Sequence, residues 1–172
     1  MQDKSIISLI GMTGVGKTTV GKILAQKLNF DFLDLDLLIT RKTGKTPAEI
    51  FALYGEEKFR EIESEELENV FRNHTQNFVL SCGGGIVLRE ANIETLKKNS
   101  FVVWLVRDID EIAKTPEILS RPPINGDINN YTELFGRREK LYEKTSDLKT
   151  GCSDISSAVK NILAGMLTKP KQ

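Results

Sequence analysis

Residues 5–20 read SIISLIGMTGVGKTTV, which is a short apolar run, a glycine-rich turn and the beginning of a second apolar pattern. The run from Ser5 to Ile10 is apolar on consecutive positions and rich in isoleucine, which is typical of a strand buried on both faces of a parallel sheet. After the glycines, apolar residues recur at helical spacing, at Val20, Ile23, Leu24 and Leu28. This spacing predicts a helix over about 17–28.

The glycine-rich turn matches the pattern G-x-x-x-x-G-K-[ST] at every fixed position, which indicates a phosphate-binding loop (P-loop). Its residues are Gly11, Met12, Thr13, Gly14, Val15, Gly16, Lys17 and Thr18, and Thr19 follows. Glycines let consecutive backbone amides face a phosphate, and the N-terminus of the next helix favours the same anion. We therefore expect the loop and Thr19 to bind ATP, with Lys17 on the β- and γ-phosphates and Thr18 offering its hydroxyl to Mg²⁺.

Further short apolar runs alternate with helical patterns along the chain. They lie at 32–35, 78–81 and 101–106, and a fifth, shorter run lies near Leu148. This alternation predicts βαβ units, and so an α/β fold of three layers in which helices flank a mainly parallel five-stranded sheet. The length suits one domain over 1–172.

Helix starts and breaks divide the rest of the chain. A capping box at Thr46-Pro47-Ala48-Glu49 begins one helix, and Gly55 followed by two glutamates begins another, so helices are expected over about 37–73. The polar segment at about 112–130 contains proline and glycine and is expected to be a mobile lid. Helical patterns then follow at 131–144 and 155–167.

Composition limits the classes of partner. The 24 basic and 24 acidic residues give a formal net charge of zero, so we expect neither nucleic acid nor an anionic membrane as a partner. No apolar stretch approaches the roughly 20 residues that span a bilayer, and the first residues do not resemble a signal peptide. Cys82 and Cys152 form no zinc-binding pattern, so we expect reduced thiols in a cytoplasmic protein.

Two acids follow the second predicted strand. Asp34 and Asp36 flank Leu35, and alternation along an extended segment would place both carboxylates on one face. Because strand C-termini in this kind of sheet point toward the phosphate loop, one acid suits Mg²⁺ and its waters, and the other suits a substrate hydroxyl or its proton. The alternative is a solvated strand end whose aspartate caps a helix.

Other candidate groups are ambiguous when each is taken alone. Arg60 and Glu63 lie on an acidic helix, where composition favours a surface ion pair. The triplet Gly83–Gly85 follows a strand and leaves backbone amides bare, which allows a substrate to approach closely. Arg121 lies in the polar lid segment, and Arg138 lies shortly before a helix end.

In order, these motifs resemble the shikimate kinase family. They are the P-loop, F-L-D-L-D, G-E-E-K-F-R-E-I-E, G-G-G, R-P-P-I and R-x-x-L-Y, and they extend from Ser5 to about Tyr142. The resemblance implies a Mg²⁺-dependent transfer of the γ-phosphoryl group of ATP to the 3-hydroxyl of shikimate, in the biosynthesis of aromatic amino acids. It also implies a monomeric enzyme.

The resemblance assigns the acceptor residues. It implies that Asp36 binds the substrate hydroxyls and is the candidate base, and that Arg60 and Arg138 bind the substrate carboxylate. Glu63 would hold Arg60, and the backbone of Gly83, Gly84 and Gly85 would line the substrate pocket.

The same resemblance assigns the nucleotide side. Asp34 would lie near Mg²⁺ with Thr18, and Arg121 would close on the ATP phosphates. Lys17, Asp36 and Arg121 are therefore the expected catalytic residues.

Three alternatives share the phosphate loop: a gluconate-type sugar-acid kinase, a nucleoside monophosphate kinase and a catalytically weak regulatory protein. The glycine triplet and the pair Arg60 and Arg138 favour a small carboxylate over a nucleotide as acceptor. Asp34 and Asp36 argue against a regulatory protein, since an ATP sensor needs no acceptor site.

Overall fold

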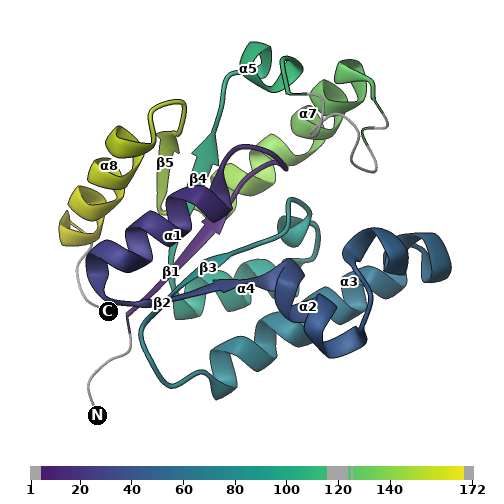
Figure 1. The fold of residues 1–172 in the computed structure, drawn as a ribbon, viewed down its shortest axis with the longest axis horizontal. Coiled ribbons are helices and arrows are strands. Elements are labelled where there is room, and N and C mark those ends of the chain that lie inside the picture. The colour runs from purple at the N-terminus through teal and green to yellow at the C-terminus, as the bar shows by residue number, and fades with distance from the viewer. Residues whose placement is uncertain (1–4, 116–123, 125, 169–172) are drawn as a thin grey trace.

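Five parallel strands form the centre of the computed structural model, which describes residues 5–115, 124 and 126–168 (Figure 1). All four neighbouring pairs are parallel. From one edge to the other, the strands are β2 (Asp31–Asp34), β3 (Phe78–Ser81), β1 (Ile6–Ile10), β4 (Phe101–Val106) and β5 (Leu148–Gly151). The predicted five-stranded α/β sheet is thus confirmed, and it is parallel throughout.

The strand order places β1 between β3 and β4, with Leu9 opposite Ser81 on one side and Val103 on the other. The chain crosses from β1 toward β2 on one side, while β4 and β5 lie on the other. In open α/β sheets ligands bind outside the carboxyl ends of the strands at such a reversal of order. The glycine-rich loop after β1 lies at this point.

Helices cover both faces of the sheet (Figure 1). Helices α1 (Lys17–Leu28) and α8 (Ile155–Thr168) pack together on one face, and α4 (Glu90–Asn99) and α7 (Ile128–Thr145) pack together on the other. The long helix α3 (Pro47–Asn73) packs on α4 and on the short helix α2 (Leu35–Thr43). Two short elements, η1 (Ile86–Leu88) and α5 (Ile109–Ala113), follow β3 and β4.

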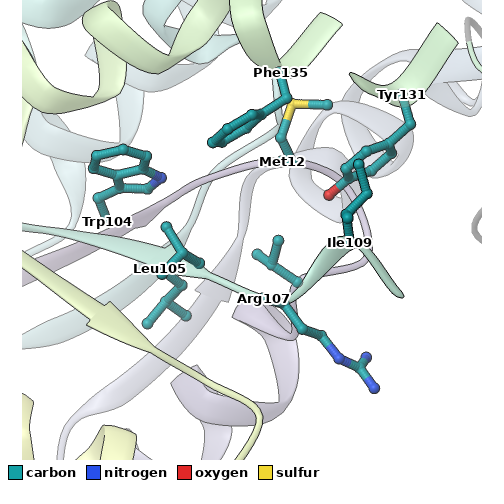
Figure 2. Close-up of a pocket in the computed structure, with 9 residues that line it drawn as sticks. Met12, Trp104, Leu105, Arg107, Ile109, Tyr131 and Phe135 are labelled. Atoms are coloured by element: carbon teal, nitrogen blue, oxygen red, sulfur yellow. The ribbon is translucent and has the colours of Figure 1, made fainter. Parts of the chain in front are cut away.

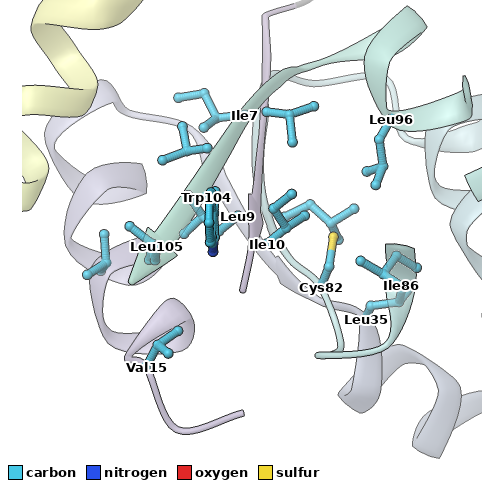
Figure 3. Close-up of a cluster of buried hydrophobic side chains, with 14 of the residues drawn as sticks. Ile7, Leu9, Ile10, Val15, Leu35, Cys82, Ile86, Leu96, Trp104 and Leu105 are labelled. Carbon is cyan, nitrogen blue, oxygen red and sulfur yellow. The ribbon is translucent and has the colours of Figure 1, made fainter. Parts of the chain in front are cut away.

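The hydrophobic core lies on both sides of the central strands. All of β1 is buried, and Figure 3 shows Ile7, Leu9 and Ile10 among side chains from β4 and from the segment after β3. Burying each such side chain stabilises the fold by roughly 1.5–3 kcal/mol, so the strand that precedes the glycine-rich loop is held firmly. Cys82 and Trp104 are also buried here.

Several element boundaries agree with the sequence. The helix expected over 17–28 and the strands expected over 78–81 and 101–106 have the predicted ends, and the short fifth strand near Leu148 is present. The predicted helix start at Thr46 is confirmed, because its hydroxyl caps Glu49 N while the Glu49 carboxylate accepts from Thr46 N. Gly55 has φ 82° and ψ 171°, so it breaks α3 where a second helix start is predicted.

Two boundaries differ from the predictions. The second strand ends at Asp34 instead of running through Leu35, because Asp34 caps α2 by accepting from Leu37 N at 3.3 Å. The helix expected from 131 begins at Ile128, inside the segment expected to be a lid, because Asp127 caps it through Asn129 N. Residues 116–123 and 125 of that segment lie outside the described residues. Among the helices that are described, none is both long and apolar enough to cross a membrane.

Candidate active site

The glycine-rich loop joins β1 to α1 and has the backbone of a phosphate site. Gly11, Gly14 and Gly16 have φ of 139°, 81° and 104°, values that other residues rarely adopt. At Gly11 an added Cβ would also collide with the carbonyl oxygen of Leu105 in β4. The buried side chain of Val15 fixes the loop to the core. The loop therefore presents backbone amides and the N-terminus of α1 to one point, which suits an anion.

Lys17 folds back over the loop. Its ammonium group donates to the carbonyl oxygens of Gly11 and Met12 at 2.9 and 2.8 Å, and the side chain is largely buried. A strongly hydrated cation is costly to bury without partners, so these carbonyls hold it in place. Lys17 thus brings a positive charge to the point at which the loop amides converge.

Three oxygen-bearing side chains gather beside Lys17, one in the first turn of α1 and two at the ends of neighbouring strands. Thr18 Oγ1 donates to Asp34 Oδ2 at 2.9 Å and lies 3.5 Å from Ser81 Oγ. Asp34 and Ser81 are themselves opposite each other in β2 and β3. Hydroxyl and carboxylate oxygens suit Mg²⁺, which in nucleotide sites takes one or two protein ligands besides phosphate oxygens. The oxygens of Thr18, Asp34 and Ser81 therefore fit a cation bound together with a nucleotide. Within the part of the chain that the structure describes, no three His, Cys, Asp or Glu gather as an all-protein metal cage.

Asp36 reaches the site by a different route from the one predicted. It lies in the first turn of α2, so it does not alternate with Asp34 along a strand. Its carboxylate nevertheless faces the segment after β3, since a Cβ added at Gly83 would lie 3.2 Å from Asp36 Oδ1. The alternative of a helix-capping aspartate applies to Asp34, which both caps α2 and accepts from Thr18.

The glycine turn, Gly83–Gly85, is the point at which the parts of the site meet. A Cβ added at Gly83 would lie 2.7 Å from Glu63 Oε1, and one added at Gly84 would lie 3.2 Å from Thr13 N of the P-loop. One added at Gly85 would overlap the guanidinium group of Arg60. Each glycine thus lies against a different part of the site, and none leaves room for a side chain.

Arg60 is an interior residue. Only 7% of it is exposed, and its Nη1 donates to Glu63 Oε2 at 2.6 Å while Nη2 lies 3.2 Å from Glu56 Oε1. The rings of Phe51 and Phe59 flank it, 5.5 and 5.0 Å from its central carbon. The prediction from composition that Arg60 belongs to a surface ion pair is therefore wrong. The bend at Gly55 and the apolar face of α3 turn this arginine toward the glycine turn.

Glu63 supports Arg60 from inside the fold. It is fully buried, and its Oε1 has no hydrogen-bond partner among the described residues. Burial raises the pKa of this carboxyl, and the neighbouring Arg60 partly offsets the shift. The pair can persist in the interior because each group neutralises the other.

Arg138 approaches the same turn from α7. Its Nη1 donates to the carbonyl oxygen of Gly84 at 3.2 Å, and the residue is 8% exposed. Arg60 and Arg138 therefore lie at adjacent glycines, on helices far apart in the sequence. Two guanidinium groups so placed can bind one carboxylate through forked hydrogen bonds.

Thr19 lies on the exposed face of α1, and Arg121 lies outside the described residues.

Comparisons with known proteins agree with this geometry. The family model described as shikimate kinase matches residues 13–166. The chain belongs to the shikimate kinase family. A shikimate kinase of Clostridium botulinum (strain Eklund 17B / Type B) is 38% identical over 141 residues, covering 82% of this chain and 84% of that protein. One from Caldicellulosiruptor bescii is 33% identical over 167 residues, covering 95% and 96%.

A solved structure of a shikimate kinase is also similar to this one. The enzyme from Acinetobacter baumannii, in complex with shikimate, superimposes with a TM-score of 0.87 at 31% identity, covering 98% of this chain and 96% of that one. The similarity therefore extends over nearly the whole chain. The family resemblance inferred from the sequence motifs is therefore confirmed.

In this member of the shikimate kinase family, sequence reasoning missed several residues at the site. Ser81 ends β3 opposite Asp34, Phe51 flanks Arg60, and Tyr142 donates to Gly84 O. A signal was available for Tyr142, which lies four residues after Arg138 and so on the same face of a helix. Phe51 and Ser81 carry no signal beyond an ordinary apolar or strand position.

An apolar pocket lies beside the P-loop, between the end of β4 and α7 (Figure 2). In Figure 2, Met12 of the loop lies near Phe135 and Tyr131 of α7, with Trp104 and Leu105 on the facing strand. Its full lining is Met12, Val15, Trp104, Leu105, Val106, Arg107, Ile109, Tyr131 and Phe135. Because this lining includes none of the predicted acceptor residues, the pocket is distinct from the site at the glycine turn.

Proposed function

We propose that this chain transfers the γ-phosphoryl group of ATP to the 3-hydroxyl of shikimate, giving shikimate 3-phosphate and ADP. One observation carries the proposal: the glycine turn touches the P-loop at Gly84, the acids Asp36 and Glu63 at Gly83, and Arg60 at Gly85. A phosphate site and a site for a hydroxylated carboxylic acid therefore share one junction. Shikimate, with one carboxylate and three hydroxyls, matches the second site.

The nucleotide side is assigned to the P-loop. Its amides and the N-terminus of α1 bind the phosphates, and Thr19 contributes from the exposed side of α1. Lys17 exchanges carbonyl partners for phosphate oxygens and stabilises the charge that develops during transfer. Arg121 is proposed as a second cation for the phosphates.

The metal is assigned to the oxygen cluster beside the loop. Thr18 would hold Mg²⁺ directly, and Asp34, which accepts from Thr18, would bind its waters. When bound, Mg²⁺ neutralises charge on the phosphate oxygens. The chain's own contribution is to hold Thr18, in the first turn of α1, against Asp34 at the end of β2.

The acceptor side is assigned to α2, α3, the glycine turn and α7. Arg60 and Arg138 bind the shikimate carboxylate, which fixes the orientation of the ring. Asp36 accepts a hydrogen bond from the 3-hydroxyl and takes its proton as the oxygen bonds to the γ-phosphorus. The bond from phosphorus to the β–γ bridging oxygen breaks, and ADP leaves.

The proposal includes a monomer acting in the cytoplasm. The balanced charge offers no general attraction for nucleic acid or anionic lipid.

An acceptor assay tests the proposed function. ADP release is measured with MgATP and shikimate, gluconate, a nucleoside monophosphate or no acceptor. We expect release to depend on shikimate and to yield one phosphorylated acceptor for each ADP. Turnover with gluconate or a nucleotide would instead identify another kinase, and equal release without acceptor would indicate an ATPase or regulatory protein.

A further inference from the structure

One face of α7 carries three polar side chains that point into the protein. Tyr131, Arg138 and Tyr142 follow one another at seven and four residues, so they form one stripe along the helix. All three are buried. Tyr131 donates to the carbonyl oxygen of Thr13 at 3.4 Å, whereas the other two donate to Gly84. This face of α7 therefore contacts both the P-loop and the glycine turn.

The Tyr142 hydroxyl makes the shorter of the two bonds to Gly84. It donates to the Gly84 carbonyl oxygen at 2.5 Å, against 3.2 Å for Arg138 Nη1, and lies 3.6 Å from the sulfur of Met12. Its ring stacks on Trp104 of β4, with centroids 5.8 Å apart. Burial raises the pKa of Tyr142 to about 12, so at neutral pH the hydroxyl keeps its proton and donates.

Gly84 is the middle residue of the glycine turn and the one that touches the P-loop. Two donors on its carbonyl oxygen fix the plane of the peptide that joins Gly84 to Gly85, because the peptide unit is planar. The residues on either side of Gly84 lie against Asp36, Glu63 and Arg60. The orientation of this one peptide therefore sets the placement of the P-loop relative to the acceptor groups.

We propose that Tyr142 is a positioning residue for phosphoryl transfer. Its hydroxyl fixes the Gly84–Gly85 peptide, and so keeps the acceptor groups in register with the phosphate loop. The proposal rests on the proposed function, because it assigns a role in transfer to an acceptor held at the glycine turn. It adds a fully buried group to which the proposed function assigns no contact with nucleotide or acceptor.

The substitution Tyr142→Phe removes only the hydroxyl. The ring can still stack on Trp104, and Gly84 O keeps Arg138 as a donor, so no buried carbonyl loses every partner. Thr145→Val is the matched control on the same helix. Thr145 is fully buried, and its hydroxyl donates at 2.6 Å to Leu141 O within α7, away from the site.

The kinetic test compares kcat, the acceptor KM and the dissociation constant of MgADP in both variants and the wild type. Because a displacement of about 1 Å can cost on the order of a hundredfold in rate, we expect Tyr142→Phe to lower kcat at least about tenfold. Its MgADP affinity should stay within about twofold, and Thr145→Val should keep both values. A kcat within twofold of wild type in Tyr142→Phe, or equal losses in both variants, would overturn the proposal.

Hydrogen exchange of the unliganded full-length chain provides a readout that needs no acceptor. The peptide covering 82–88 should exchange faster in Tyr142→Phe than in the wild type. In Thr145→Val its exchange rate should equal that of the wild type. Unchanged exchange in Tyr142→Phe would overturn the proposal whichever acceptor the enzyme uses. Failure of the wild type to phosphorylate shikimate would instead refute the proposed function. The hydrogen-exchange measurement would still test whether Tyr142 fixes the Gly84–Gly85 peptide.

Discussion

Gly85 lies against the guanidinium group of Arg60, and the positions of many site residues depend on such close contacts of backbone with side chain. Gly83 has the same relation to the carboxylate of Glu63, whereas Gly84 lies against the backbone of the P-loop at Thr13. At the scale of the residue, therefore, the glycines act by leaving space, and the charged groups act by filling it. Predictions at this scale concern the acceptor more than the nucleotide.

Gly85→Ala should displace Arg60, because the new methyl group would occupy the place of its guanidinium group. We expect the KM for shikimate to rise at least about tenfold, the effect of losing a charge-assisted bond, while MgADP affinity is kept. Steady-state kinetics and calorimetry measure these two quantities. Gly136→Ala on α7 is the control: nothing lies within 4 Å of the added Cβ, and it should stabilise the helix by up to about 1 kcal/mol.

Asp36→Asn should lower kcat on the order of a hundredfold or more, since an amide cannot accept the proton of the hydroxyl. The binding of ATP should be unchanged, because Asp36 lies in the first turn of α2 beside Gly83, on the acceptor side of the glycine turn. Rapid-quench measurement of the transfer step tests the first part, and nucleotide titration tests the second. A near-normal rate would show that another group accepts the proton.

At the scale of the element, the sequence predicts strands better than connections. The strands β1, β3 and β4 are buried on both faces, so they appear as continuous apolar runs. Helix α4 was not predicted, because only Ile93, Leu96 and Asn92 of its ten residues are buried and its polar remainder lacks a clear apolar stripe. The start of α2 was misplaced because FLDLD suits a strand as well as a capped helix, and only the bond from Leu37 N to Asp34 distinguishes the two.

Sequence patterns likewise predict only part of the candidate active site. The P-loop is local in sequence, so its motif alone identifies it. Arg60 and Arg138 come together only through the packing of α3 and α7 around the glycine turn, and composition alone places Arg60 on the surface. The family resemblance supplied the role that local patterns could not, whereas the part played by Tyr142 required the hydrogen bonds of the folded chain.

The capping box of α3 is a prediction about an element. Thr46→Ala removes the hydroxyl that accepts from Glu49 N at 3.3 Å, so we expect a loss of about 1 kcal/mol in the free energy of unfolding. The bend at Gly55 separates this cap from Arg60, so the KM for shikimate should change less than about twofold. Urea unfolding and kinetics on one preparation measure both. A large rise in KM would show that the two halves of α3 move together.

At the scale of the whole molecule, strand order explains why the site lies where it does. β1 leads into the P-loop, β2 ends at Asp34, and β3 leads into the glycine turn. These three strands are neighbours in the sheet, in the order β2, β3 and β1. Their carboxyl ends therefore bring the P-loop, Asp34 and the glycine turn to one edge of the sheet. Helices α3 and α7 add the two arginines.

The reactivity of the two cysteine thiols tests how tightly the interior of the protein is packed. Cys82 and Cys152 are both buried, and burial raises the pKa of both thiols, that of Cys152 to about 11. A higher pKa leaves less thiolate, so at pH 8 Cys152 should react with DTNB about a hundredfold more slowly than an ordinary thiol, and Cys82 more slowly still. Unfolding in urea should release two reactive thiols. Rapid reaction of the native protein would contradict this packing.

The claim that the phosphate site and the acceptor site meet at the glycine turn is tested most directly by ³¹P NMR of the protein with MgATP and shikimate. The account predicts one new phosphomonoester signal, coupled to the proton on carbon 3 of shikimate, that grows in equal amount with ADP. Inorganic phosphate as the only new signal besides those of ADP, or a phosphoryl group on another hydroxyl, would contradict the proposed meeting of the two sites at the glycine turn.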